Sequence, residues 1–452
     1  MDTTLTRPPE AAGGLQPPSP REPADIGLPE RFVGELVLKT FYRRGALTGD
    51  RLAELVCLPF WALEPQLVEF QERKIIEVLR SEGLGRHGYT FELTGEGRSR
   101  ARVLMETMPY VGPAPVPMDQ YTKGVELQSI RNVHVGPARV KKGLEHLVLN
   151  AETVDLLGPA VNAARSVFLF GEPGNGKTTI SEAVVRMFGD HIFIPWAVYA
   201  EGQVIQLYDP VAHQIVPVDE LEGDDASPSF LAPAPSYDRR YTKIERPMVM
   251  VGGELTLDQL ELRWDAEAGF YQAPPQMKAN GGVFVIDDFG RQRVAPRDLL
   301  NRWMVPLDRG IDFLSFRSGQ RATIPFATLV VFATNLNPHE LMDEAFLRRI
   351  RHKIEIGSPN PEQFAEIFRR QCARRGIPFR TEAVDWLYLE YYGRRGIAPR
   401  GCHPIDLVSE IADLAAFYDQ KPDLSVELLA HACNSYFVSM LPNTGPKVNH
   451  VN

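Results

Sequence analysis

The sequence predicts an α/β protein: a parallel sheet forms the central domain, a small domain of helices and strands precedes it, and an all-helical domain follows. Three short apolar runs predict the sheet. They lie at residues 166–170, 283–286 and 328–334, and such runs are typical of buried parallel strands. Polar or glycine-rich residues follow each run, at the ends of strands where open α/β sheets bind ligands. After residue 357 only helical periodicity remains.

The whole chain has the composition of an ordinary globular protein. Of its 452 residues, 44% are hydrophobic and 24% charged, with a net charge of -9 and a pI of about 5.7. The acidic balance argues against a protein that mainly coats nucleic acid, although it leaves room for one small DNA-reading module. The four cysteines form no C-x-x-C pair, so neither a zinc site nor a disulfide framework is indicated. No apolar run reaches membrane-spanning length. We therefore expect a cytoplasmic location and no membrane span.

The chain begins with two segments of different character. Residues 1–29 are rich in proline, which predicts a disordered tail, with a docking arm as the alternative. Residues 30–108 have the order helix, helix, helix, strand, strand, helix, which resembles a winged helix. Residues 109–117 contain four prolines and predict a semi-rigid linker.

The third helix of this front domain would be the DNA-reading helix of a winged helix. It carries Glu64, Glu69 and Glu72 against Arg73 and Lys74, and residues 31–108 hold 12 Lys and Arg against 11 Asp and Glu. Phosphate binding needs several clustered cations. Protein docking or a packing role is therefore favoured over DNA binding.

The central domain spans residues 118–357, and its first apolar run leads into Gly171-Glu172-Pro173-Gly174-Asn175-Gly176-Lys177-Thr178. This is the P-loop pattern G-x-x-x-x-G-K-[ST] in full. Its glycines let backbone N–H groups surround phosphate oxygens, and a following helix adds the positive end of its dipole. Lys177 would reach the β- and γ-phosphates, and Thr178 would ligate Mg²⁺. The predicted ligands are thus ATP and Mg²⁺, and the predicted nucleotide-binding residues here are Gly171, Pro173, Gly174, Asn175, Gly176, Lys177, Thr178 and Thr179.

Two further apolar runs end in polar residues. Asp287 and Asp288 follow the second run in a Walker B pattern. Asp287 would hold Mg²⁺ through its water shell, and Asp288 would orient and polarise the attacking water. Asn335 follows the third run and would hydrogen-bond the γ-phosphate or the water, although an Asn at a strand end is also an ordinary turn residue. Before the second run, the alternating stretch at 248–271 predicts a hairpin.

The last part of the chain is basic and then helical. Arg348, Arg349 and Arg351 stand within four residues, which by itself is typical of a solvated helix face. Residues 358–440 predict a helical domain that carries Arg400 before its second-last helix. Residues 441–452 predict a flexible tail.

The P-loop, the strand ending in two acids, the strand ending Ala-Thr-Asn, the Arg-Arg-Ile segment and the helical domain occur in this order over residues 166–410. Together they resemble the AAA+ ATPases. The resemblance implies an α/β P-loop NTPase (AAA+) fold with an N-terminal winged-helix-like domain and a C-terminal all-helical lid. It also implies ATP hydrolysis at the subunit interfaces of a homo-oligomeric ring, with a hexamer favoured.

The resemblance also implies roles for individual residues. Asn335 matches sensor 1, and Arg400 matches sensor 2 of the lid. Arg349, with Arg348 beside it, matches the arginine finger that reaches the γ-phosphate of the neighbouring subunit. One departure is that the second Walker B acid is usually Glu, whereas Asp288 is shorter by one methylene group.

Finer features resemble a hairpin-bearing branch of this family. These are the insertions before residue 281, the segment 313–325, and the short sequence segments 110–117 and 287–292. With the front domain, they resemble bacterial ATPases described as having chaperone activity and associated with Flp pilus assembly. This implies remodelling of a protein client of a pilus or secretion system. The alternatives are an ATP-switched regulator that binds DNA through the front domain, and a nucleotide-dependent scaffold with little turnover.

Overall fold

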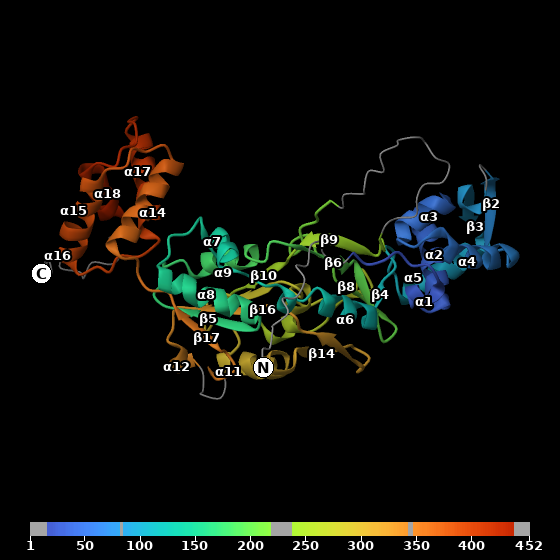
Figure 1. The fold of residues 1–452 in the computed structure, drawn as a ribbon. Coiled ribbons are helices and arrows are strands. Elements are labelled where there is room, and N and C mark those ends of the chain that lie inside the picture. Colours follow the sequence, from blue (N-terminus) through green and yellow to red (C-terminus); the bar gives the residue numbers. More distant parts are fainter. Residues whose placement is uncertain (1–15, 82–84, 218–236, 342–346, 438–452) are drawn as a thin grey trace, which may run out of the picture.

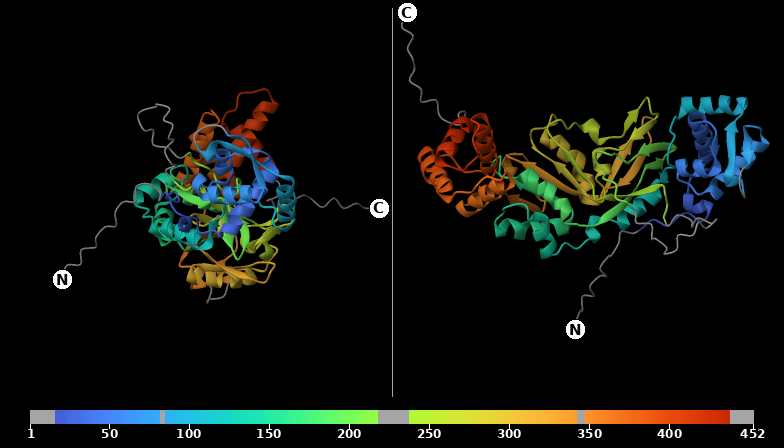
Figure 2. Two further views of the ribbon diagram at one scale, coloured as in Figure 1. Left: turned by 90° about the vertical axis from the view of Figure 1, so that its right-hand side faces the viewer. Right: turned by 90° about the horizontal axis from the view of Figure 1, so that it is seen from above.

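The protein was analysed as a computed structural model that describes residues 16–81, 85–217, 237–341 and 347–437. Its domains form an elongated row with the helical domain at one end, the parallel sheet in the middle and the front domain at the other end (Figure 1). A view from above shows the same order (Figure 2). No helix among the described residues combines the length and apolar character needed to cross a membrane.

The front domain packs helices on a three-stranded antiparallel sheet with the strand order β1-β3-β2. The apolar residues of its first long helix recur at helical spacing, so Phe32, Leu36, Val37 and Phe41 all face the core. Its elements are α1 (Pro23–Ile26), α2 (Glu30–Arg44), β1 (Leu47–Thr48), α3 (Gly49–Val56), α4 (Phe60–Glu72), β2 (Ile76–Ser81), η1 (Arg86–Gly88), β3 (Tyr89–Leu93) and α5 (Gly95–Thr107).

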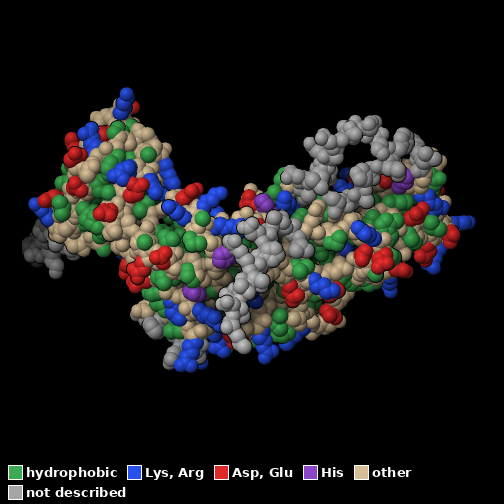
Figure 3. Space-filling model, in the orientation of Figure 1, with side chains coloured by type: hydrophobic (Ala, Val, Ile, Leu, Met, Phe, Trp, Pro, Cys, Tyr) green, Lys and Arg blue, Asp and Glu red, His purple; other side chains and the backbone are tan. Residues whose placement is uncertain are grey.

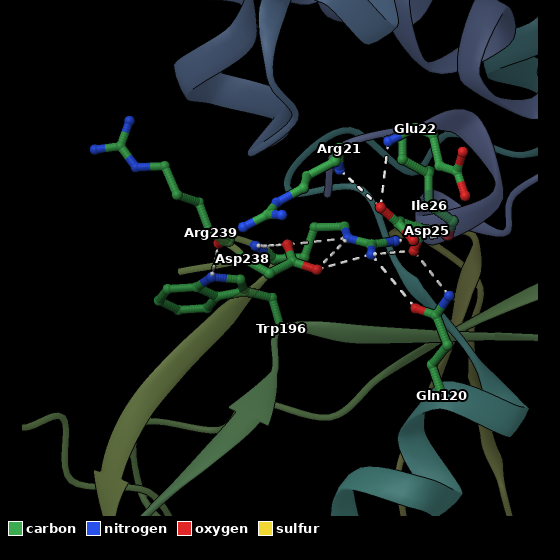
Figure 4. Close-up of polar contacts among 9 residues, drawn as sticks. Arg21, Glu22, Asp25, Ile26, Gln120, Trp196, Asp238 and Arg239 are labelled. Carbon is green, nitrogen blue, oxygen red and sulfur yellow. Dashed lines mark hydrogen bonds and ion pairs between the residues drawn. The ribbon is translucent and has the colours of Figure 1, made fainter. Parts of the chain in front are cut away.

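The segment 16–29 differs from the disordered tail that the sequence predicts for residues 1–29. Arg240 donates hydrogen bonds to the carbonyls of Asp25 (3.2 Å) and Ile26 (2.8 Å) and pairs with the carboxylate of Asp238 (2.7 Å). The Asp238 backbone N–H in turn donates to the Pro17 carbonyl at 2.9 Å. Figure 4 shows the segment held against the central domain at this point. For residues 16–29 the structure therefore agrees with the docking-arm alternative; composition favoured disorder because the contacts depend on a distant arginine that binds backbone carbonyls. Residues 1–15 lie outside the described part of the chain.

The segment 109–117 also differs from the linker that the sequence predicts. Its last two residues form β4 (Val116–Pro117), which pairs in parallel with β7 (Ala197–Ala200). Proline has no N–H to donate, so it is suited to such an edge strand. Tyr110 packs edge-on against Phe270 with ring centroids 5.5 Å apart. The front domain thereby shares one hydrophobic cluster with the central domain.

The central parallel sheet has the strand order β10-β13-β16-β5-β17, and every neighbouring pair is parallel. The three predicted strands are its middle members, which confirms the α/β architecture. One hydrophobic cluster covers each face of the sheet. The elements are α6 (Met118–Leu127), η2 (Ile130–Asn132), α7 (Pro137–Leu144), α8 (Ala151–Ala163), β5 (Ser166–Phe170), α9 (Lys177–Arg186), β10 (Met248–Val251), β13 (Val283–Ile286), α11 (Pro296–Arg309), β16 (Leu329–Thr334), α12 (Pro338–Leu341) and β17 (His352–Glu355).

A second sheet is inserted on the side of the front domain, with the order β11-β12-β8-β7-β4. It shares a core with the hairpin β14-β15 and with Tyr121 of α6. The hairpin predicted at 248–271 is present only in part, because its first strand is β10 of the parallel sheet. The remaining elements are β6 (His191–Pro195), β8 (Gln203–Gln206), β9 (Tyr241–Glu245), η3 (Leu257–Leu260), β11 (Arg263–Asp265), β12 (Phe270–Gln272), α10 (Pro275–Lys278), β14 (Ile311–Ser315) and β15 (Arg321–Pro325).

The C-terminal described residues form a helical domain with its own core. Its first helix begins where the sequence predicts, because Asn360 accepts a hydrogen bond from the Gln363 N–H at 2.8 Å and Pro361 occupies the first turn. Its helices are α14 (Pro361–Arg374), α15 (Thr381–Trp386), the π-helix η4 (Leu387–Tyr392), α16 (Gly393–Arg395), α17 (His403–Phe417) and α18 (Val426–Tyr436). The predicted tail at 441–452 lies outside the described residues.

Candidate nucleotide-binding site

Most of the predicted site residues meet in one cavity between the carboxyl edge of the parallel sheet and the helical domain. The cavity holds about 480 Å³ and is lined by the P-loop, Asp287, Asp288 and Asn335, with Gly401 and Cys402 on the opposite side. The register explains the meeting, because β5, β13 and β16 are parallel neighbours and their ends share one edge. Figure 3 shows Lys and Arg side chains gathered where the helical domain meets the central domain.

The P-loop has a backbone shape that requires its glycines. Gly171, Gly174 and Gly176 have φ angles of 137°, 84° and 85°, which lie in the left-handed region that favours glycine. At Gly171 a Cβ atom would also stand 2.4 Å from the Ile356 carbonyl oxygen. The α9 helix starts immediately after this loop, at Lys177. The loop therefore presents backbone N–H groups and a helix N-terminus together, as a phosphate site needs.

The cation of the P-loop lies over the loop itself. The Lys177 ammonium donates to the carbonyls of Gly171 and Glu172, both at 2.9 Å. Burial lowers the pKa of Lys177, and the carboxylates of Asp287, Asp288 and Glu172 act in the opposite direction. This balance keeps a partly desolvated cation beside the place where phosphates would lie.

Two side-chain contacts organise the acids. The Thr178 hydroxyl donates to Asp287 Oδ2 at 2.9 Å, so the two predicted Mg²⁺ residues are in contact. The Asn335 amide donates to Asp288 Oδ1 at 3.1 Å. The described residues contain no group of three or more His, Cys, Asp or Glu that would hold a metal ion alone. This donor set suits Mg²⁺, which keeps several waters and takes one or two protein ligands plus phosphate oxygens.

The helical domain reaches the P-loop through the residues around Arg400. The Arg400 guanidinium lies 3.5 Å from the Glu172 carboxylate. The Gly401 N–H donates to Asn175 Oδ1 at 3.1 Å, and the Cys402 N–H donates to the Gly174 carbonyl at 2.7 Å. Arg400 therefore lies beside the P-loop, next to Gly401 and Cys402, which line the cavity.

Sequence reasoning missed the other end of the cavity. His146, Leu147, Val148 and Leu149 line it together with Ile367, Arg370 and Arg374 of α14. Arg370 donates to the carbonyls of Glu145 (2.8 Å) and Leu147 (3.4 Å). Burial lowers the pKa of His146, and the nearby Arg186 and Arg374 lower it further. A slot lined by apolar side chains and flanked by cations, next to a phosphate site, is suited to a planar base, but no motif marks this segment.

Arg348 and Arg349 are not brought to the cavity of their own chain. The Arg349 carbonyl accepts a hydrogen bond from the Ser166 hydroxyl at 3.4 Å, and its guanidinium pairs with Asp308 at 2.9 Å. Ser166 is the first residue of β5 and Phe170 the last, so roughly 15 Å of strand separates Arg349 from the P-loop edge. These arginines therefore lie at the opposite, amino edge of the sheet.

Comparisons with known proteins give partial matches. A family model described as a domain of unknown function (DUF8689) matches residues 360–435, within the helical domain. No curated protein matches the chain. Among solved structures, the RuvB Holliday junction branch migration motor of Thermotoga maritima is 15% identical over 67% of this chain and 70% of that chain, with a TM-score of 0.33. NtrX of Brucella abortus is 13% identical over 68% of this chain and 61% of that chain, with a TM-score of 0.38. Because these similarities are low, the geometry of the site carries the functional conclusion.

Proposed function

We propose that the protein is an AAA+ ATPase that binds ATP between the parallel sheet and the helical lid and hydrolyses it within a homo-oligomeric ring, with a hexamer favoured. The observation that carries this proposal is the convergence at one sheet edge of Lys177, the Thr178–Asp287 contact and the Asp288–Asn335 contact. Arg400 faces the same loop from the lid. Each of these groups suits one part of a phosphoryl-transfer site.

ATP binding would use the P-loop and the lid together. The loop N–H groups and Lys177 would hold the β- and γ-phosphates. Thr178 and Asp287 would hold Mg²⁺, which supplies neutralisation of phosphate charge when bound. The apolar slot at 146–149 would take the base, and Arg400 would approach the γ-phosphate from the lid. The ligand would thus span both domains.

Hydrolysis would depend on Asp288 and Asn335. In this proposal Asp288 accepts a hydrogen bond from the attacking water and takes its proton as the water oxygen bonds to the γ-phosphorus. The bond from that phosphorus to the bridging oxygen breaks, which releases ADP and phosphate. Asn335 holds Asp288 and the water in line. The energetic benefit comes mainly from positioning and charge stabilisation.

The ring is supported by the position of the two arginines. Arg348 and Arg349 lie at the amino edge of the sheet, where Figure 3 also shows Lys and Arg side chains over α11 and α12. A cation at this edge lies away from the phosphate site of its own chain, and in a ring it would face the phosphate site of a neighbouring subunit. A trans-acting arginine is worth about 10³–10⁵ in rate, so we expect full activity only in the assembled form.

The client is proposed to be a protein of a pilus or secretion system, recognised in the cytoplasm. The strand order and helices of the front domain support a winged-helix-like reading. On α4, which corresponds to the third helix predicted for this domain, the exposed or half-exposed face carries Trp61, Glu64, Pro65, Val68 and Glu72. Such an acidic and apolar face fits a protein better than DNA. If the full chain shifted the electrophoretic mobility of duplex DNA in a salt-dependent way, this would instead favour the DNA-binding regulator.

The test combines solution mass with phosphate release, with and without ATP and Mg²⁺. We expect the wild type to assemble and release phosphate. Lys177→Ala should lose ATP binding, and Asp288→Asn should bind ATP without hydrolysing it. An unchanged mass with no phosphate release would contradict the motor and leave the nucleotide-dependent scaffold as the better account.

A further inference from the structure

We propose that Gln292 is a positioning residue that holds Asp288 in a left-handed turn, and that this turn is the reason why an aspartate, and not the longer glutamate, occupies the second acid position. The inference rests on the proposed ATPase function and deepens it. It also gives a role to the segment Asp287-Asp288-Phe289-Gly290-Arg291-Gln292, whose last four residues the site has not used so far.

The backbone at Asp288 is unusual for a residue with a side chain. Its φ angle is +49°, inside the left-handed region. Asp and Asn enter this region several times more often than other residues with side chains, because their short polar side chains bond locally. Glutamate has no such preference. The turn also aims the short carboxylate at Asn335, whose amide lies 3.1 Å away.

Gln292 closes this turn with both ends of its side-chain amide. Its Nε2 donates to the carbonyls of Asp287 (2.9 Å) and Asp288 (3.2 Å), and its Oε1 accepts from the Gly290 N–H at 2.7 Å. Gly290 has a φ of +101°, so the turn contains a second left-handed residue. One half-buried side chain therefore fixes three backbone groups around the acid.

The turn is anchored to the strand that carries Asn335. Phe289 is fully buried, its N–H donates to the Ala333 carbonyl at 2.7 Å, and its carbonyl accepts from the Thr334 hydroxyl at 2.6 Å. Asn335 directly follows these residues. The distance between Asp288 and Asn335 is thus set by the turn and its anchor, and Gln292 is the side chain that keeps the turn closed.

A purely structural role for Gln292 predicts a different outcome from a positioning role. Loss of a structural residue lowers stability and nucleotide binding together. Loss of a positioning residue lowers the catalytic constant and leaves nucleotide affinity unchanged, since the P-loop holds ATP independently of the Asp288 backbone. Gln292→Glu separates the two, because it keeps the size and one acceptor but removes the donor that faces two carbonyls.

The experiment compares Gln292→Glu, Asp288→Glu and Asp288→Asn with the wild type, and uses Gln214→Glu as a control with the same chemical change on an exposed loop. The affinity for a fluorescent ATP analogue, kcat and KM are measured on the assembled full chain. We expect Gln292→Glu to lower kcat by about 10²-fold, the scale of a 1 Å misplacement, with KM and affinity within about two-fold. Asp288→Glu should also lose activity although it keeps the carboxylate, and Gln214→Glu should match the wild type.

Several results would overturn the inference. One is an unchanged kcat in Gln292→Glu, and another is an Asp288→Glu variant as active as the wild type. A wild type that releases no phosphate would contradict the proposed function itself. The turn is then tested by hydrogen exchange: Gln292→Ala should speed exchange of the Gly290 amide, and unchanged exchange would refute the role of Gln292.

Discussion

The two junctions of the central domain differ in how they are built. Where the front domain meets the inserted sheet, the pair Arg240–Asp238 is only 1% and 5% exposed, and Arg240 also binds the carbonyls of Asp25 and Ile26. Where the helical domain meets the P-loop, the pair Arg400–Glu172 is 28% and 68% exposed and its atoms are 3.5 Å apart. The first junction also shares a hydrophobic cluster across the two domains.

This difference indicates which parts can move relative to one another. A junction with a shared apolar core and a satisfied buried arginine opens only at a large free-energy cost. A junction made of a few polar contacts opens more easily. The front domain is therefore a rigid extension of the inserted sheet, and under the proposed function the helical domain is the part whose position ATP would change. A client bound to the front domain would therefore move together with the whole central domain.

The largest expected effect comes from breaking the buried pair. Arg240→Met leaves the Asp238 carboxylate buried without its partner, and such a change destabilises proteins by about 3–5 kcal/mol. Arg400→Met breaks the exposed pair and should lower stability by less than about 1 kcal/mol. Urea unfolding of both variants measures the contrast, and hydrogen exchange of residues 17–28 should rise only in Arg240→Met.

Equal losses of stability in these two variants would contradict the difference between the junctions. A stable Arg240→Met with protected amides at 17–28 would show that the apolar cluster alone holds the front domain. Arg240→Lys is a useful intermediate, because it keeps the charge and loses the planar set of donors. We expect it to fall between the wild type and Arg240→Met.

A pH dependence above neutral pH is expected at the front junction. Lys39 is buried, its ammonium donates to the Met108 carbonyl at 2.9 Å, and the ring of Phe32 beside it packs at a tilt of 55° against Tyr199 of β7, with centroids 4.8 Å apart. Burial lowers the pKa of Lys39 from 10.5 to about 8. Between these pH values the unfolded chain binds a proton that the folded chain does not, so this group makes folding more favourable as pH rises.

Lys39→Met removes this dependence. The unfolding free energy of the wild type minus that of Lys39→Met should rise by about 1 kcal/mol per pH unit between pH 8 and pH 10, and should be flat below pH 7. Urea unfolding at each pH measures it, and the subtraction removes the titration of the buried tyrosines. A difference that stays constant across this range would show that Lys39 is not desolvated by the junction.

The sequence predicted the carboxyl edge of the sheet better than it predicted either junction. The P-loop, Asp287, Asp288 and Asn335 follow contiguous apolar runs, and parallel strands bring the ends of such runs together whatever the rest of the chain does. The docking of residues 16–29 depends on a contact between Ile26 and Arg240, which are 214 residues apart, and no local pattern marks such a contact. The strand β4 was missed for the same reason, since its partner β7 lies about 80 residues further along the chain.

The end of the cavity formed by residues 146–149 and α14 also could not be predicted from local sequence patterns. It provides the test with the smallest expected effect. Arg369 and Arg370 of α14 both pair with Glu366, but only Arg370 reaches the carbonyls of Glu145 and Leu147. Both pairs are at least one-third exposed, so Arg369→Gln and Arg370→Gln should each change stability by less than about 1 kcal/mol. Arg370→Gln should still weaken ATP binding about five-fold, because it removes roughly one hydrogen bond of about 1 kcal/mol that fixes the slot for the base. Titration with a fluorescent ATP analogue measures this. An equal effect of Arg369→Gln would mean that the charge of the lid helix, and not its contact with the slot, governs affinity.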